Sequence, residues 1–509
     1  MATAPPSHSR TTSAQTQVDE YPEFQKVSSP NGDSDSIQGV SLEATIPPNH
    51  LNRTLVLCFD GTGDQFDSDN SNVVNFFSLL RKDDPKVQLV YYQVIVLSSS
   101  SYLTPDSSLK AGIGTYNAPE IASPFAAKLS RIVDSMIGVH LDAHVMGGYE
   151  FLMQNYEAND KICIFGFSRG AYTARALAGM IHKVGLLPRC NHQQVPFAYR
   201  MYSREDELGW AQSAAFKKAF SIDVDIEFLG VWDTVDSVGI IPRRLPFTAS
   251  NTHVRHFRHA LSLDERRVRF KPALWHRPGE MPKAAPPKRH QQSLKPKPHH
   301  QKSLVQHERE FEASSTCHRD NTPTDVEEVW FSGCHCDVGG GSVANDVTNS
   351  LARIPLRWMI RQCFLLNTGI LFHREMLKPF GIEPSNLYPV VKPRPPPITS
   401  LSSEASSDTV CEETEDLKDA LSPLYDQLSL VPAWWILEWL PAKIRYQKHD
   451  DTWSGTVTVN AGNPRHIPRQ KMQGVKVHRT VKLRMESENV AGGKYEPKAG
   501  WKVEPIWVD

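Results

Sequence analysis

A serine lies in the pentapeptide Gly166-Phe167-Ser168-Arg169-Gly170, which follows the apolar run KICIF and precedes an alanine-rich segment. The pattern G-x-S-x-G is typical of a nucleophilic serine held in a sharp turn between a strand and a helix. The residues two positions away must be small to avoid clashes, so we predict that Ser168 is a nucleophile and that Gly166 and Gly170 permit the turn. The following helix would point its amides at the reacting centre, and the N–H of Arg169 would be one oxyanion donor.

A nucleophilic serine needs a general base, and the base needs an acid that orients it. In α/β hydrolases these residues follow in the order serine, acid, histidine. Two loops after apolar runs offer them, because Asp233 follows FLGVW and His335 follows EEVWFSG. Both stand where side chains emerge at the carboxyl edge of a parallel sheet, so we predict a triad of Ser168, Asp233 and His335. Asp236 is the alternative acid, and Asp337 would support the site or bind His335 locally.

A second glycine-bearing strand end reads CFDGTGD. An early loop supplies the second oxyanion N–H in α/β hydrolases, and Gly61 and Thr62 are the candidates here. Asp60 is either a turn residue or a supporting acid, since acids at strand ends also bind metals. The cysteines on either side of His335 lack the usual C-x₂-C spacing of a zinc site. We therefore predict no metal and no other cofactor.

Other histidines among the twenty could compete for the role of base. His256, His259 and His276 lie in a polar segment that looks helical and lacks the setting of a strand end. His466 and His478 belong to the C-terminal segment, and they would matter only if that segment folds over the site.

The elements that would position these residues alternate between apolar strands and helices. Strands are predicted in TLVLCF, at 87–97, in KICIF and at the beginnings of 226–239 and 326–341, and helical periodicity covers roughly 126–156. Alternating strands and helices predict a mostly parallel sheet covered on both faces. We therefore expect an α/β fold of the α/β-hydrolase type, with disordered insertions and a C-terminal extension.

Composition divides the chain into ordered and low-complexity parts. Residues 1–50, rich in Ser, Pro, Thr and Gln, are predicted to be a disordered tail. A catalytic domain is expected over 51–385, interrupted by a low-complexity, Pro-, Lys- and His-rich insertion at about 277–325. Residues 386–425 are predicted to be a disordered linker rich in Pro, Ser and acids, and 426–509 a C-terminal region packed on the catalytic domain.

Charge and hydropathy exclude several classes of protein. The 509 residues include 56 basic and 57 acidic side chains, so no net field attracts phosphate and a polycationic nucleic-acid binder is excluded. A hydrophobic content of 40% excludes a fully disordered chain. We see no secretory signal and no run of 18 apolar residues, and the eight scattered cysteines are typical of free thiols in a reducing compartment. We therefore expect a cytoplasmic protein.

Five blocks occur in the order FDGTG, GFSRGAYTARALAGMI, GVWDTVDSVG, HALSLDERR and WFSGCHCDVGGG. Together they resemble the catalytic domain of the type VI secretion phospholipase effector family, first lipase class, over roughly 53–385. The resemblance implies an α/β-hydrolase fold and hydrolysis of phospholipid esters. It also implies Ser168 as the nucleophile, Asp233 as the acid and His335 as the base.

The chain departs from the family pattern at two places. Cys336 takes a position that usually holds a small residue. In the family a tyrosine-rich strand runs almost directly into a Gly-x-Gly-Thr loop, whereas here YYQ (91–93) is separated from GIGTY (112–116) by residues 94–111. We interpret that segment as an unspliced intron or a gene-model artefact, which sequencing of the transcript would test.

We predict a serine esterase or phospholipase-like hydrolase that cleaves carboxylic esters, of lipids or phospholipids, through an acyl-enzyme. The expected partner is an ester or lipid small molecule and no nucleic acid, and no oligomeric state follows from the sequence. Trp434, Trp435 and Trp439 suit a peripheral membrane contact, although a buried amphipathic helix is the commoner explanation.

Two alternatives stay open. The first is a catalytically inactive interaction protein that retains the hydrolase fold and acts through its basic and acidic insertions. The second is a metal-dependent phosphoesterase that uses Asp60, His335 and Asp337.

Overall fold

The computed structural model describes the following parts of the chain: 44–48, 51–62, 68–95, 141–235, 244–275, 303–314, 323–399, 411–447, 453–468 and 474–509. Several predicted features lie outside them, among them most of the N-terminal tail, residues 96–111, the first half of the helix at 126–156, most of the 277–325 insertion, and Asp236. Residues 43–509 form one compact unit, and all the elements below belong to it.

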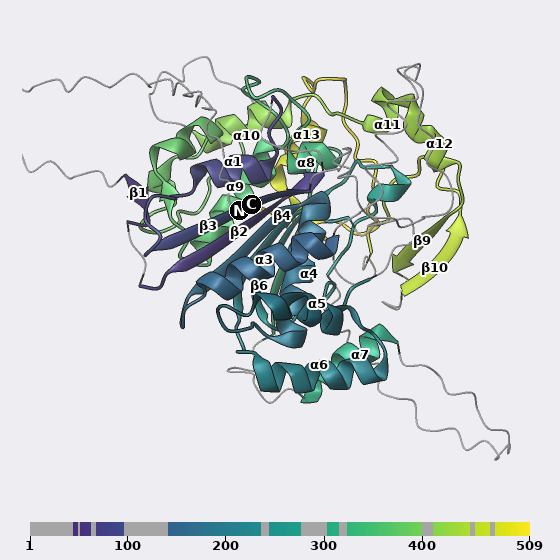
Figure 1. Ribbon diagram of the computed structural model, residues 1–509. Helices are drawn as coiled ribbons and strands as arrows, with labels where there is room; N and C mark the ends of the chain where they lie inside the picture. Colours follow the sequence, from purple (N-terminus) through teal and green to yellow (C-terminus); the bar gives the residue numbers. More distant parts are fainter. Residues whose placement is uncertain are drawn as a thin grey trace, which may run out of the picture. The chain divides into compact units, whose positions relative to one another are not determined.

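Within the described residues, an eight-stranded sheet in the order β12-β11-β7-β6-β5-β4-β2-β3 forms the centre of this unit (Figure 1). Every neighbouring pair in it is parallel. The strands are β2 (Thr54–Thr62), β3 (Gln88–Ile95), β4 (Lys161–Phe167), β5 (Ile226–Trp232), β6 (Val254–Ser262), β7 (Asp325–Phe331), β11 (Lys476–His478) and β12 (Ile506–Val508). Two antiparallel pairs lie outside the sheet: β1 (Thr45–Ile46) with β8 (Phe372–His373), and β9 (Ala442–Gln447) with β10 (Trp453–Thr458). The predicted α/β fold is confirmed.

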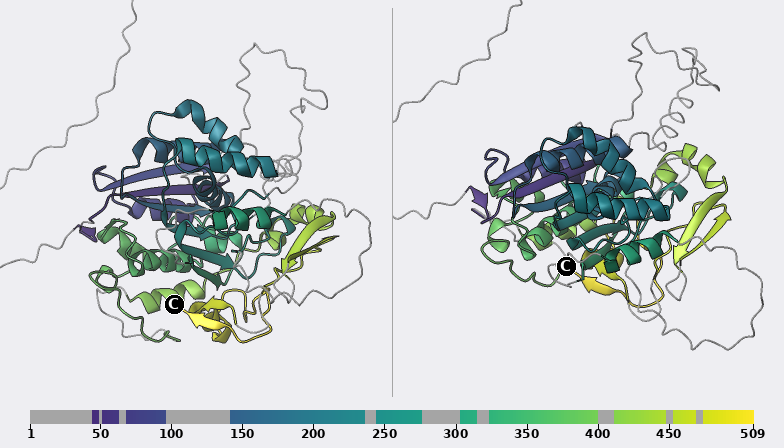
Figure 2. Two further views of the ribbon diagram at one scale, coloured as in Figure 1. Left: turned by 90° about the horizontal axis from the view of Figure 1, so that it is seen from below. Right: turned by 60° about the horizontal axis from the view of Figure 1, so that its bottom comes forward.

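Helices cover both faces of the sheet (Figures 1 and 2). One face packs against α3 (Leu141–Asn155), α4 (Ser168–Val184), α5 (Val195–Ser203) and α6 (Glu207–Phe220), and the other against α1 (Asn72–Leu79), α9 (Arg353–Leu365) and α10 (Glu412–Ala420). In β2, Leu55 and Leu57 join the first core, whereas Val56 and Cys58 join the second. The run LVLCF is apolar throughout because successive side chains enter two different cores.

The remaining elements are short. The helices are α7 (Leu304–Ser314), α8 (His335–Gly339), α11 (Gln427–Leu430), α12 (Trp435–Glu438) and α13 (Arg479–Glu486). The 3₁₀ turns are η1 (His192–Gln194), η2 (Val268–Phe270), η3 (Glu375–Phe380), η4 (Pro384–Asn386) and η5 (Pro432–Trp434). No helix within the described ranges combines the length and the apolar character that crossing a bilayer requires.

The strand order reverses between β2 and β4. From β2 the chain passes outward to β3, and it then returns to form β4 on the other side of β2, from which β5, β6 and β7 follow in sequence. Such a switch point opens a crevice at the carboxyl ends of the strands, where open α/β sheets bind their ligands. Asp60, near the end of β2, and Ser168, at the beginning of α4, both lie at this point.

The expectation of a helix around His256 and His259 is wrong, because both residues belong to β6. This strand lies in the interior of the sheet, but it has polar side chains whose partners are on β7. Arg258 Nη2 lies 2.6 Å from Asp325 Oδ2, and His259 Nδ1 lies 3.1 Å from Glu328 Oε1. The paired charges replace the apolar run that would have indicated a strand. His276 lies outside the described residues.

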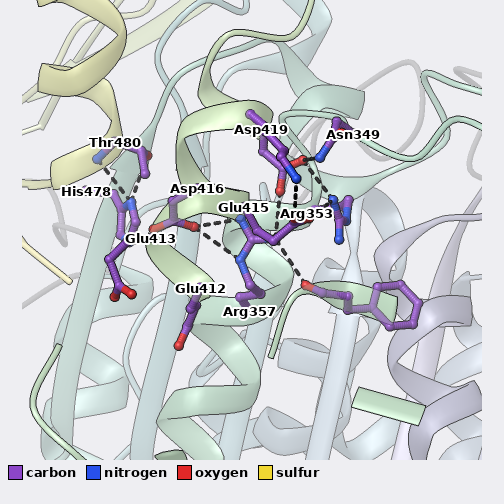
Figure 3. Close-up of polar contacts among 12 residues, drawn as sticks. Asn349, Arg353, Arg357, Glu412, Glu413, Glu415, Asp416, Asp419, His478 and Thr480 are labelled. Carbon is purple, nitrogen blue, oxygen red and sulfur yellow. Dashed lines mark hydrogen bonds and ion pairs between the residues drawn. The ribbon is translucent and has the colours of Figure 1, made fainter. Parts of the chain in front are cut away.

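Helix α10 lies within 386–425, the range that the sequence predicts as a linker. Leu417 and Ala420 of α10 join the apolar core on this face, and charged side chains also connect α10 to α9 (Figure 3). Arg357 lies 2.6 Å from Asp416 and 2.7 Å from Asp419, and Arg353 lies 3.0 Å from Asp419. We call these four residues the α9–α10 cluster. Its carboxylates give the segment its disorder-like composition, and the arginines opposite explain why it is helical.

The C-terminal region extends the main sheet. β11 pairs with β7, and β12 pairs with β11. Val477 and Val481 form a separate core with Leu261 and Trp330 of the central strands. This packing brings residues beyond 460 to the carboxyl ends of β5 and β6.

Candidate active site

The turn between β4 and α4 places Ser168 at the first position of the helix with a φ of +58°. A side chain rarely adopts this left-handed backbone, which is the strain that the motif predicts. A Cβ on Gly166 would lie 2.6 Å from the carbonyl oxygen of Gly170, and a Cβ on Gly170 would lie 2.2 Å from that of Phe59. Both glycines therefore allow a backbone contact that any larger residue would prevent.

The structure brings Ser168, Asp233 and His335 together from the ends of three strands. Nε2 of His335 lies 2.8 Å from Oγ of Ser168, and Nδ1 lies 2.6 Å from Oδ2 of Asp233. All three side chains are buried. With its proton on Nδ1, the imidazole donates to the carboxylate and accepts from the serine hydroxyl.

The imidazole of His335 is held neutral by its surroundings. Phe167 and Phe270 pack on the ring with centroid distances of 4.7 and 4.8 Å. Burial lowers the pKa of His335, and the hydrogen bond to Asp233 opposes this effect without cancelling it. A neutral imidazole at physiological pH can accept a proton from the serine.

Asp233 is ionised although it is fully buried. Burial alone would raise its pKa, but the guanidinium of Arg465 and the hydrogen bond from His335 outweigh that effect and hold the pKa well below its usual range. The backbone N–H of Ser262 donates to Oδ1 at 2.9 Å. The carboxylate is thus fixed as an anion beside the imidazole.

Arg465 is the residue of this site that the sequence analysis missed. Its Nη1 lies 2.6 Å from Oδ1 of Asp233 and its Nη2 lies 2.8 Å from Oδ2, and neither side chain is exposed. Arg465 belongs to no motif. The sequence offered one signal: its neighbour His466 was expected to matter only if the C-terminal segment folds over the site. The segment does fold there, and it brings Arg465 to Asp233.

Asp337 stabilises the turn that carries His335. Its carboxylate accepts from the backbone N–H groups of Cys334 at 2.9 Å and Tyr425 at 3.0 Å, and from the hydroxyl of Ser342 at 3.2 Å. Burial raises the pKa of Asp337 to about 6, and these hydrogen bonds oppose the rise. Both ring nitrogens of His335 already have other partners, so Asp337 caps α8 instead of binding the imidazole.

The glycines after His335 allow close packing. A Cβ on Gly339 would lie 1.8 Å from the ring of Phe167, and Gly340 has a φ of +87°. Because Phe167 directly precedes Ser168, this contact fixes α8 against the turn that carries the serine.

Asp60 holds the end of β2 in place. Its Oδ1 accepts from the N–H of Gly61 at 2.7 Å, and its Oδ2 accepts from Ser71 Oγ and Tyr92 Oη, each at 2.8 Å. The N–H of Gly61 would therefore have to exchange its partner before it could bind an oxyanion. Thr62 is the last residue of β2.

The N–H of Arg169 belongs to the first turn of α4, where amide groups point beyond the beginning of the helix. The residues proposed for a metal-dependent reaction have other roles: Asp60 and Asp337 accept from protein donors, and His335 contacts the serine and Asp233. In the part of the chain that the structure describes, no group of three His, Cys, Asp or Glu side chains is arranged to hold a metal ion.

Comparison with known proteins gives one family and a few relatives. Residues 53–362 match the model of the family described as T6SS, phospholipase effector Tle1-like, catalytic domain. The uncharacterized protein YEL023C of Saccharomyces cerevisiae is 26% identical over 576 aligned positions, which cover 89% of this chain and 81% of the relative.

Two solved structures are also similar, each at 15% identity. An uncharacterized protein from Pseudomonas aeruginosa has a TM-score of 0.29, with 63% of this chain and 46% of that chain covered. The Tle1 effector bound to the VgrG spike of the type VI secretion system has a TM-score of 0.25, with 57% and 51% covered. The chain thus spans about half the length of each.

Proposed function

Because the chain belongs to the family of Tle1-like phospholipase effector catalytic domains, we propose that it is a serine hydrolase that cleaves the carboxylic esters of lipids or phospholipids. One observation carries the proposal: hydrogen bonds run without interruption from Oγ of Ser168 through the imidazole of His335 to the carboxylate of Asp233. This arrangement is what nucleophilic catalysis by a serine requires.

In the proposed mechanism, Oγ of Ser168 attacks the ester carbonyl carbon while Nε2 of His335 takes the hydroxyl proton. The imidazolium then donates that proton to the leaving alcohol, and an acyl-enzyme remains on the serine. Water attacks the acyl group with His335 again as the base, and the carboxylic acid product leaves. Asp233 stays ionised throughout and stabilises the imidazolium.

The negative charge that develops on the carbonyl oxygen needs N–H donors. We propose the N–H of Arg169 as the first donor, because it lies at the beginning of α4 directly after the nucleophile. Thr62 is the preferred second donor, since the N–H of Gly61 already donates to Asp60.

A fluorophosphonate probe tests the proposal, because it reacts with an activated serine whatever the natural ester. We expect the full-length protein to be labelled at Ser168 and the Ser168→Ala variant to lose labelling. Ester turnover should fall by about 10⁶-fold in that variant. Ser213→Ala removes another buried serine, whose hydroxyl hydrogen-bonds within α6, and should be labelled normally.

Labelling that persists in Ser168→Ala, or an unlabelled wild type, would contradict the proposal. Loss of activity on treatment with a chelator, with no effect of Ser168→Ala, would favour the metal-dependent alternative. A screen of esters with increasing acyl length and of phospholipids with different head groups, with Ser168→Ala as the blank, then defines the substrate.

We also propose that the segment from α11 to Leu440, just beyond α12, contacts lipid surfaces. Trp434 is buried and packs on Phe270, which in turn packs on His335. Trp439 and Leu440 of the same segment are 63% and 51% exposed. Exposed aromatic and aliphatic side chains next to a lipid-cleaving site suit the interface of a bilayer.

Co-sedimentation with phosphatidylcholine vesicles tests this contact. A Trp439→Ser, Leu440→Ser double variant should sediment less than wild type, while Phe220→Ser, which changes an exposed residue of α6, should sediment equally. Equal sedimentation of all three proteins would exclude the contact.

A further inference from the structure

We propose that Arg465 is a positioning residue for the candidate triad, whose guanidinium holds the carboxylate of Asp233 in the orientation that His335 requires. The inference rests on the proposed hydrolase function and assigns a role in it to the C-terminal region. Arg465 lies about a hundred residues beyond the range 53–362 that matches the family model.

The geometry leaves the carboxylate no freedom to rotate. Oδ1 of Asp233 accepts from Nη1 of Arg465 and from the N–H of Ser262, while Oδ2 accepts from Nη2 of Arg465 and faces Nδ1 of His335. The guanidinium is a planar fork that binds both oxygens at once, which a lysine could not do. Rotation of the carboxylate away from the imidazole would break two charged hydrogen bonds.

Arg465 is itself fixed by the last residue of β6 and by η2. Its Nη1 lies 2.8 Å from Oγ of Ser262 and 3.1 Å from the carbonyl oxygen of that residue, and its Nε donates to the carbonyl of Phe270 at 3.0 Å. Phe270 also packs on the ring of His335. One arginine therefore connects the acid, the end of β6 and the wall of the histidine pocket.

The charge of Arg465 also affects the base. A buried aspartate with no other counter-ion would stabilise the imidazolium strongly and keep His335 protonated at higher pH. The guanidinium shares that negative charge, so the imidazole stays neutral and able to accept a proton. Other charged or titratable groups that interact with Asp233, His335 or Arg465 include His259, Glu265, Arg267 and Lys271, and the guanidinium of Arg267 also lowers the pKa of His335.

The rate constant of fluorophosphonate labelling, measured from pH 4.5 to 8.5 on full-length protein, tests the inference without a known substrate. Arg465→Met should label about 10²-fold more slowly than wild type, because the carboxylate is no longer held in place. The acid limb of its pH profile should move up by roughly one pH unit, because the imidazolium gains a carboxylate whose charge is no longer shared.

Three further variants separate positioning from folding. Arg465→Lys keeps the charge but not the fork, so its acid limb should stay near that of wild type while its rate falls. Guanidinium ion in the buffer should restore part of the labelling rate of Arg465→Ala. Arg484→Met removes another buried arginine of the C-terminal region, which binds the carbonyls of Ala420 and Ser422, and should lower the melting temperature without moving the acid limb.

Wild-type labelling rates in the Arg465 variants would overturn the inference and leave the proposed function intact. The inference would also be overturned if Arg465→Met and Arg484→Met lost labelling rate to the same extent for the same decrease in melting temperature. In that outcome the acid limb would not move and guanidinium ion would not restore the rate of Arg465→Ala. If the wild type is not labelled at Ser168, the proposed function fails and the inference fails with it.

Discussion

Two buried groups of arginines and carboxylates look alike as ion pairs but differ in what lies beside them. In the α9–α10 cluster, Arg357 contacts Asp416 and Asp419, and both carboxylates face arginines. At the candidate site, Asp233 faces Arg465 on one side and an imidazole on the other. A buried arginine–carboxylate pair therefore indicates chemistry only where a proton-accepting group and a nucleophile complete it.

The comparison also separates stability from activity. Buried ion pairs add little net stability relative to apolar packing, yet they are costly to break, because one charge is left without a partner. The α9–α10 cluster should therefore affect only the folded fraction of the protein. The pair of Asp233 and Arg465 at the candidate site should affect both the folded fraction and the rate of ester turnover per folded molecule.

Asp233→Asn is expected to give the largest difference between the two regions. The variant keeps the shape of the side chain but removes the charge that stabilises the imidazolium, so turnover per folded molecule should fall by about 10⁴-fold. Asp416→Asn is the matched control, since it neutralises a buried carboxylate of the cluster. Ester turnover and the rate of probe labelling measure both. A similar loss per folded molecule in Asp416→Asn would contradict the separation.

Arg357→Met should produce the next largest effect, and it should appear in stability. The variant removes the cation that Asp416 and Asp419 share and leaves them with Arg394 and Arg353, so the free energy of unfolding should fall by about 3 kcal/mol, the low end for a broken buried pair. Lys378→Met removes a cation from an exposed pair with Glu375, and it should cost no more than about 1 kcal/mol. Urea denaturation measures both values. Probe labelling of the folded Arg357→Met protein should match wild type, and a selective loss of labelling would connect the cluster to the site.

His478 provides a smaller test, in the dependence of stability on pH. Its ring packs on Phe331, and burial lowers its pKa to about 3. Between pH 6.5 and 3 the unfolded chain binds a proton that the folded chain rejects, so stability is lost as the pH falls through this window. Relative to His478→Gln, the free energy of unfolding of the wild type should decrease by about 1.4 kcal/mol for each pH unit below 6.5. Urea denaturation at pH 7, 6 and 5 measures the difference, and a constant difference would show that the folded protein accepts the proton.

Much of the fold was predictable from short apolar runs. LVLCF and KICIF have the continuous hydrophobicity of strands covered on both faces, and the structure has them as β2 and β4. The candidate triad could be proposed because Ser168 and Asp233 directly follow strands, His335 lies four residues after the end of β7, and parallel strands bring their carboxyl ends to one edge. Their proximity in the structure agrees with that expectation, and their catalytic roles stay a prediction.

The features that the sequence did not predict depend on partners distant along the chain. Strand β6 and helix α10 pair charged side chains with β7 and α9, and hydropathy alone does not predict such pairing. The N–H of Gly61 donates to the Asp60 side chain because of how that side chain is rotated, and the spacing of residues in the sequence does not determine this rotation. Arg465 lies in a segment without regular structure, and only the folded chain brings it to Asp233.

The late position of Arg465 along the chain bears on how the protein is made. The ribosome synthesises Ser168, Asp233 and His335 well before it reaches residue 465. At about 5–20 residues per second, the delay between His335 and Arg465 is on the order of ten seconds. A nascent chain therefore carries all three members of the candidate triad while the carboxylate is still without its guanidinium. The growing polypeptide is therefore expected to react with cellular esters at a reduced rate until residue 465 has been synthesised and has folded onto Asp233.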